Sequence, residues 1–205
     1  TSEVSSYPHS KLVYYRLTEN GDTVVGPVDI TATTDHLDVD QSAAFAPEAG
    51  PGGLWGLAWN RSLGDTNEIW FQRVEESDGS PAGPPVQLGG WTGYMDGVAI
   101  AWNPAVPPAG AWEVVWTEYP LDESEAPLML RRVAADGTVL GGSPTRLSDD
   151  PDPESPPFDE VPVVVATSTG ELRAVTWSFD HAHGQYEVGL LRADVDGNRL
   201  GPRLL

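Results

Sequence analysis

Hydrophobic and polar residues alternate along four similar stretches of the chain, each of which crosses a glycine-containing turn into a second extended stretch. The four are LVYYRLTENGDTVVGPVDI, IWFQRVEESDGSPAGPPVQL, LMLRRVAADGTVLGGSPTRL and VGLLRADVDGNRLGPRLL. A period of two predicts β-strands, and an Asn-Gly or Asp-Gly pair between two strands predicts a hairpin. The chain therefore contains an internal repeat, and we expect it to fold as a stack of similar β units.

A second predicted hairpin precedes three of these four stretches. The segments LWGLAWN, WEVVWTE and LRAVTWS each end an alternating pattern on a tryptophan, which makes Trp59, Trp116 and Trp177 equivalent positions. With Trp55 and Trp112 they predict a ladder of aromatic side chains packed between neighbouring units rather than a sugar-binding platform. The strands QSAAFAP, VAIAWNP and VPVVVAT come just upstream. One complete unit is thus four antiparallel strands.

Antiparallel four-stranded units repeated every 45 to 55 residues or so are typical of β-propeller blades. We therefore predict an all-β, β-propeller-like array of four-stranded antiparallel blades in a single domain, residues 1–205. The predicted units are 12–32, which is a half unit, then 38–90, 95–148 and 158–205. Because the half unit lacks its first hairpin, its open strand edge is a template for pairing. We expect the rest of a larger polypeptide, or a partner chain, to complete this first blade.

Charge and composition limit the classes of partner that the chain is expected to bind. Asp and Glu number 31 against 11 Lys and Arg, which gives a net charge of −20, and Lys11 is the only lysine. Binding to a phosphate backbone rests on basic side chains, so nucleic acid is excluded as an expected partner. There is no cysteine, which leaves out disulfides and thiol chemistry. No apolar run approaches the roughly 20 residues that cross a bilayer, so no membrane span is predicted.

The repeats resemble a known class of sequence. Val114, Val115 and Trp116, the segment from Ile69 to Val74, and the Asp136-Gly137 turn resemble the degenerate Trp/DG repeats of bacterial secreted or surface-associated β-propeller-like repeat proteins. This resemblance covers nearly everything after Leu12. It implies a propeller-like fold and a secreted or cell-surface setting in a bacterium, and it implies no particular catalytic residue.

The predicted candidate functional face is one end of the array. In a propeller, the loops between the second and third strands of a blade, and those that lead to the next blade, emerge at the same end. These loops are 33–41, 60–68, 89–97, 117–127, 148–160 and 178–186; they hold more than half of the acidic residues and one basic residue, Arg61. Loops on a repeated scaffold are where binding residues gather. The aromatic residues expected to bind a ligand there are Trp91, Tyr94, Tyr119, Phe179 and Tyr186.

Two acidic runs and two histidines at that end are the candidate metal ligands. Carboxylates at short spacing suit Ca²⁺, the one cofactor that the sequence suggests, and a histidine pair two residues apart suits a transition metal. The residues are Asp35, Asp38 and Asp40, then Asp149, Asp150 and Asp152, and the pair His181 and His183. The alternative is that they form a solubility surface, because neither acidic run matches a defined calcium loop. The DVDGN segment at 194–198 is interpreted as a hairpin turn.

These observations predict a non-catalytic extracytoplasmic binding or interaction module that presents an acidic loop face to a cation, a glycan or a basic protein surface. No catalytic residue stands out from the many carboxylates, and no nucleophile elbow is present. The alternative is a carbohydrate-active enzyme, a glycoside-hydrolase-like propeller that uses paired carboxylates.

Calcium should stabilise the fold if the acidic face binds it. A ligand that binds only the folded chain raises the free energy of unfolding with its concentration, so millimolar Ca²⁺ should raise the melting temperature relative to chelator. Neutralising Asp35, Asp38 and Asp40 together, or Asp149, Asp150 and Asp152, then identifies the loop. Superimposable melts at constant ionic strength would reduce the face to a solubility or docking surface.

Overall fold

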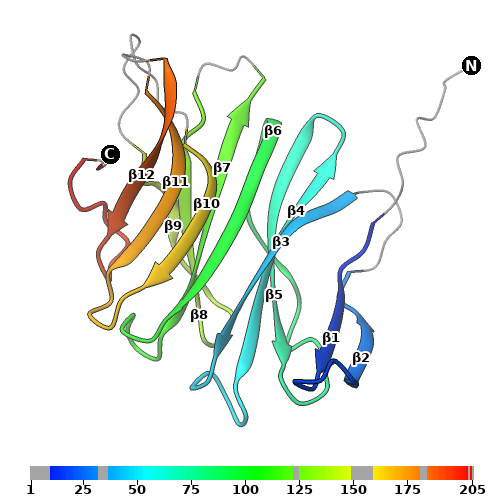
Figure 1. Ribbon diagram of the computed structural model, residues 1–205. Helices are drawn as coiled ribbons and strands as arrows, with labels where there is room; N and C mark the ends of the chain where they lie inside the picture. The colour runs from blue at the N-terminus through cyan, green and yellow to red at the C-terminus, as the bar shows by residue number, and fades with distance from the viewer. Residues whose placement is uncertain are drawn as a thin grey trace, which may run out of the picture.

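The computed structural model describes residues 10–31, 37–121, 125–148, 159–180, 184–202 and 204, and those residues contain twelve β-strands and no helix (Figure 1). The strands are β1 (Val13–Leu17), β2 (Thr23–Asp29), β3 (Leu37–Ala46), β4 (Leu54–Leu63), β5 (Thr66–Glu75), β6 (Val86–Asn103), β7 (Ala111–Pro120), β8 (Leu128–Ala134), β9 (Val139–Arg146), β10 (Asp159–Ala166), β11 (Leu172–Asp180) and β12 (Gln185–Ala193). The all-β prediction is confirmed.

Antiparallel pairing between consecutive strands divides the fold into four units. Unit 1 is the β1–β2 hairpin. Unit 2 contains β3, β4, β5 and residues 86–92 of β6, and unit 3 contains residues 93–103 of β6 with β7, β8 and β9. Unit 4 contains β10, β11 and β12, and a bridge between Leu190 and Leu204 adds the last described residue to its edge. Figure 1 shows the units side by side, from unit 1 at one edge to unit 4 at the other.

One long strand, β6, passes from unit 2 into unit 3 without a break. The prediction of a loop at 89–97 is therefore wrong. A glycine allows the strand to bend between the two sheets, since Gly97 has a φ of 90°. Another glycine allows close packing, since a Cβ on Gly89 would lie 2.8 Å from the Trp116 ring. The predicted loop at 60–68 is likewise a tight hairpin, because β4 ends at Leu63 and β5 begins at Thr66.

Two apolar cores lie between the units and hold them face to face. The first is formed by Ile69 and Phe71 of unit 2 against Trp112, Val114 and Trp116 of unit 3. The second is formed by Val115, Leu128, Leu130 and Leu147 of unit 3 against Leu172, Ala174 and Leu191 of unit 4. Successive residues of β7 contribute to opposite cores, since side chains alternate across a strand. Unit 3 is thus apolar on both faces.

The tryptophan ladder is confirmed for three of its members. Trp59 is 1% exposed, and Trp112 and Trp116 are fully buried. Trp177 is not their equivalent. Trp59 and Trp116 each pair across the sheet with a residue that lies three positions before the arginine of the next strand. Trp177 pairs with Val188, which lies four positions before Arg192.

This shift of one residue changes the face on which Trp177 lies, because a strand has a side-chain period of two. Thr176 takes the buried position against unit 3 and is 2% exposed, whereas Trp177 is on the outer face of unit 4 and is 53% exposed.

Replacing a ladder tryptophan should therefore have an effect that depends on its face. We expect Trp116→Ala to lower the free energy of unfolding by roughly 3–5 kcal/mol, since it removes a fully buried aromatic ring. The matched control Trp177→Ala should cost less than about 1 kcal/mol, because that ring is half exposed. Urea unfolding of both variants in dilute solution makes the comparison. Equal losses would contradict the register of β11.

Candidate functional site

Six of the predicted metal ligands lie outside the described residues: Asp35, Asp149, Asp150, Asp152, His181 and His183. Asp38 and Asp40 are on β3. Among the described residues, no group of three or more His, Asp or Glu side chains is gathered closely enough to hold a metal ion.

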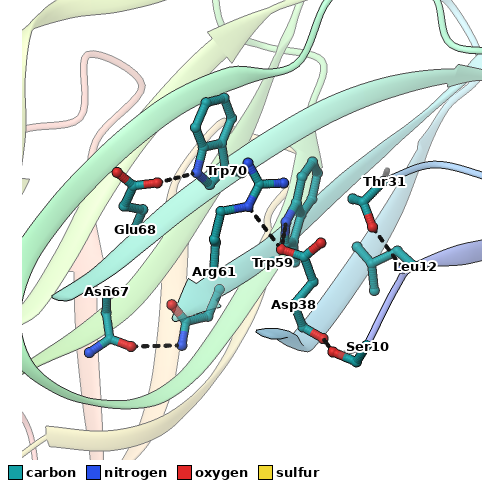
Figure 2. Close-up of polar contacts among 10 residues, drawn as sticks. Ser10, Leu12, Thr31, Asp38, Trp59, Arg61, Asn67, Glu68 and Trp70 are labelled. Atoms are coloured by element: carbon teal, nitrogen blue, oxygen red, sulfur yellow. Dashed lines mark hydrogen bonds and ion pairs between the residues drawn. The ribbon is translucent and has the colours of Figure 1, made fainter. Parts of the chain in front are cut away.

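Asp38 is built into an internal polar network rather than a loop (Figure 2). Its carboxylate is fully buried, and Oδ1 accepts hydrogen bonds of 3.0 Å from both the Arg61 Nε and the Trp59 Nε1. The carbonyl oxygen of Asp38 accepts a further bond from the Ser10 hydroxyl at 2.5 Å. The paired guanidinium and indole N–H offset the cost of burying this charge.

Arg61 joins this network to the neighbouring strand. Its guanidinium carbon lies 4.7 Å from the centre of the Trp70 ring, and the Trp70 indole N–H donates to Glu68 Oε2 at 2.8 Å. Figure 2 shows the arginine between the two tryptophans. Arg61, the basic residue of the predicted acidic loops, is therefore an internal counter-ion of Asp38 in this fold.

Asp40, by contrast, has a φ of 48°, and burial raises the pKa of its carboxyl.

The predicted aromatic ligands lie in strands near the same end of the units. Tyr94 on β6 is the cross-strand partner of Tyr119 on β7, and Phe179 on β11 is the partner of Tyr186 on β12. Trp91 packs against the core between units 2 and 3. The structure thus brings these residues together as two cross-strand pairs and one core side chain.

Glu113 is a buried carboxyl on β7, between units 3 and 4. Its Oε2 accepts a 3.1 Å hydrogen bond from the Asn103 amide, which also donates to the carbonyl of Gly170 in unit 4 at 2.8 Å. Its Oε1 has no hydrogen-bond partner in the described part of the chain. Burial raises the pKa of Glu113 to about 7, although the Asn103 bond and the charge of Arg132 lower it.

Glu113 does not form a catalytic pair with Glu118, a half-buried acid of the same strand. Burial also raises the pKa of Glu118, whose Oε1 accepts the Trp116 indole N–H at 3.1 Å. Five positions separate the two glutamates, so they lie on opposite faces of β7. A glycosidase needs its two carboxyls to flank one bond.

A cleft of about 570 Å³ lies between unit 1 and unit 2. One wall is β1 with Ile30, and the other is formed by Gln41, Ser42 and Ala43 of β3 with Trp55 and Leu57 of β4. In units 2, 3 and 4, a second strand lies beside the third strand and covers part of the sheet of the neighbouring unit. The described residues of unit 1 form only the equivalents of the third and fourth strands, and they leave part of the unit 2 face open.

The polar groups of the cleft are gathered around Glu76. The Trp55 indole N–H donates to Glu76 Oε2, and the Arg16 guanidinium lies 3.7 Å from Oε1 and donates to the Glu76 carbonyl at 3.1 Å. Burial and the neighbouring Glu76 raise the pKa of Tyr14. The cleft thus combines aromatic walls with one carboxylate that is held by Trp55 and Arg16.

The edge of β1 that faces this cleft has no partner strand among the described residues. β1 pairs with β2 along its other edge, from Val13 with Asp29 to Leu17 with Thr23. In units 2, 3 and 4, the equivalent edges of β5, β8 and β12 pair with β4, β7 and β11. The cleft is therefore bordered by backbone groups that a further strand can pair with.

Sequence reasoning did not select this cleft. It placed Trp55 and Leu57 together on one face of a strand and interpreted that face as core, because the equivalent strands are covered by a neighbouring unit. The signal that points to the cleft is the missing first hairpin of unit 1, which leaves those two side chains without a complete cover.

The charge state of Glu113 should make stability depend on pH. An unfolded glutamate ionises near 4.5 and the folded one near 7, so the folded chain keeps a proton between these values that the unfolded chain has lost. Raising the pH across this window lowers the free energy of unfolding, by about 3 kcal/mol in total. Glu113→Gln keeps an acceptor for Asn103 and should remove this part of the pH dependence. Urea titrations from pH 4.5 to 8 give the difference, and parallel curves would contradict it.

Comparison with known proteins supports the fold. Neither a protein-family model nor a curated protein matches the sequence. The solved structure titled "Hadza microbial sialidase Hz136" aligns with a TM-score of 0.54 and 11% identity, over 88% of this chain and 42% of that one. A crystal structure of an ACO/RPE65 chimera aligns with a TM-score of 0.50 and 12% identity, over 93% and 43%. Both are β-propellers, so the chain has the fold of a portion of a β-propeller and spans less than half the length of either match.

Proposed function

We propose that the chain is a non-catalytic interaction module that binds an extended segment of a partner in the cleft between β1 and the β3–β4 sheet. The observation that supports this proposal is the cleft of about 570 Å³ beside an edge of β1 that lacks a partner strand among the described residues. An edge strand beside an apolar wall is the arrangement used in recognition by strand addition.

Backbone pairing would supply affinity, and the walls of the cleft would supply selectivity. Every second side chain of an added strand points to the same side, so alternate residues would contact Trp55 and Leu57. Those contacts favour apolar side chains. The residues between them would face away, where the net charge of −20 favours lysine or arginine. The expected partner is thus a basic segment with alternating apolar residues.

A glycan is a second candidate for the same cleft. Tyr14, Tyr15 and Trp55 line it, and aromatic rings with a neighbouring carboxylate suit a sugar ring. The carbohydrate-active enzyme of the alternative hypothesis would need two carboxyls across one glycosidic bond. Glu76 is the single carboxylate among the described residues that line the cleft, and its oxygens are engaged by Trp55 and Arg16. These features favour binding over hydrolysis.

The extracytoplasmic setting is part of the proposal and rests on the resemblance of the repeats. Cation binding by the acidic loops also stays a prediction, since six of the eight candidate metal ligands lie outside the described part of the chain. None of the described segments is a helix long and apolar enough to cross a membrane.

Selection of peptides on the immobilised chain tests the binding site. We expect a random dodecapeptide library to yield basic peptides with alternating apolar residues, and hydrogen exchange of the β1 amides to slow when such a peptide binds. Ala43→Arg puts a long charged side chain into the cleft at an exposed position and should weaken binding at least about tenfold.

The matched control is Thr66→Arg, an exposed position at the β4–β5 turn, which should bind normally. A glycan array on the same material tests the second candidate. Peptides whose binding is unaffected by Ala43→Arg and leaves the β1 amides unprotected would contradict the proposal.

A further inference from the structure

We propose that two copies of this chain associate head to tail, with the outer face of unit 4 of one copy packed on the outer face of unit 1 of the other, and with Arg192 bound to the turn at Glu19. Tyr15 and Leu17 border both this interface and the cleft of the proposed function, whereas Arg192 and Glu19 belong to the interface alone. The same kind of contact occurs at all three junctions inside the chain.

At each internal junction, an arginine from one unit donates to a turn carbonyl of the next unit. Arg16 Nη1 donates to the Glu76 carbonyl at 3.1 Å, which joins unit 1 to unit 2. Arg73 Nη1 donates to the Ala135 carbonyl at 2.9 Å, and Arg132 Nη1 to the Val195 carbonyl at 2.5 Å. These bonds continue the contact from unit 2 to unit 3 and from unit 3 to unit 4.

The glycine of each receiving turn lies directly beneath the side chain of the preceding unit. A Cβ on Gly137 would lie 2.8 Å from the Arg73 Nε, and one on Gly197 would lie 3.0 Å from the Arg132 Nε. At Gly79, the Tyr14 ring takes this place. The glycines are therefore part of the junction as well as of the turn.

Unit 1 carries a turn of the same kind that receives nothing from the described part of this chain. The Gly21 N–H donates to the Thr18 carbonyl and the Thr18 N–H to the Asp22 carbonyl, which is the pattern of Ala134, Gly137 and Thr138 and of Asp194, Gly197 and Asn198. A Cβ on Gly21 would meet no atom within 4 Å. By this alignment, Glu19 occupies the acceptor position of Glu76, Ala135 and Val195.

Unit 4 carries the complementary arginine. Arg192 is on β12 at the position of Arg16, Arg73 and Arg132, and no further unit follows it among the described residues. Its Nε is buried without a hydrogen-bond partner there, and its remaining contacts are long: 3.4 Å to the Leu200 carbonyl and 4.0 Å to Glu171. The chain thus has a donor at one end of the stack and an acceptor at the other.

Both outer faces are also apolar. Tyr15, Leu17 and Val24 of unit 1 are about half exposed. In unit 4, Val163, Val165, Val175, Trp177 and Val188 are 40% to 66% exposed. Phe45, Leu63 and Leu121 are the only exposed large apolar residues that the described chain carries outside the two end units. Apolar patches of this kind mark interaction sites.

A second copy is the occupant that fits both faces at once. Contacts between two different faces close into a ring when the rotation allows it. The chain aligns with 42% and 43% of the two matched propellers, so two copies correspond to most of the length of either. Two such junctions would satisfy both ends of both copies.

Sedimentation of the full chain from about 1 to about 100 µM tests this interface. We expect a concentration-dependent dimer, and Arg192→Glu and Glu19→Arg should each weaken it by about tenfold or more. The control Arg131→Glu changes an arginine of β8 that bonds Gly141 and Gly142 of its own unit, and it should leave the dimer intact. Thermal melts in dilute solution show that each variant is folded.

An equimolar mixture of the two variants gives the decisive measurement. In a mixed dimer, the two substituted side chains would face each other at one junction with their charges exchanged, and the natural pair would meet at the other. Mixing should therefore restore association that neither variant shows alone. A chain that is monomeric at about 100 µM, a dimer indifferent to both substitutions, or a mixture that stays monomeric would each overturn the proposal.

Discussion

Burial of both faces of the unit 3 sheet is the constraint on which this fold depends. A sheet with apolar side chains on both sides needs a neighbour on each side to remove them all from water, and each end unit has one such neighbour among the described residues. Strand β7 shows this clearly, because Trp112 and Trp116 are buried on one of its faces and Val115 is buried on the other. The arginine contacts at the turns add one hydrogen bond at each junction between successive units.

The strands and their order followed from period-two patterns and from Asp-Gly turns, because these signals are local. The face on which Trp177 lies did not follow, although the sequence contained the information. The ladder tryptophan and the arginine of the next strand are 14 positions apart in unit 2 and 16 in unit 3, but 15 in unit 4. An odd spacing places the tryptophan and the arginine in a different register from that of the other units, and the pairing of β11 with β12 shows that the tryptophan is the side chain that changes face.

The candidate site was less predictable than the fold, because it results from an absence. Trp55 and Leu57 have the sequence pattern of core residues, and they become the wall of a cleft because the described residues of unit 1 form only two strands. The polar network of Asp38 shows the opposite case. Because Asp38 belongs to an acidic run, its sequence pattern predicts a metal ligand. Its partners Trp59 and Arg61 come from the adjacent strand and could not be assigned from spacing alone.

The continuity of β6 has a consequence for how the chain comes apart. Its first half completes the sheet of unit 2 and its second half begins the sheet of unit 3, so the two sheets share one covalent strand as well as one apolar core. The two sheets therefore cannot drift apart, and separating their faces would expose the apolar core that they share. Units 2 and 3 should therefore open as one cooperative block under force or local unfolding, while the end units, each packed on one side, open at lower cost.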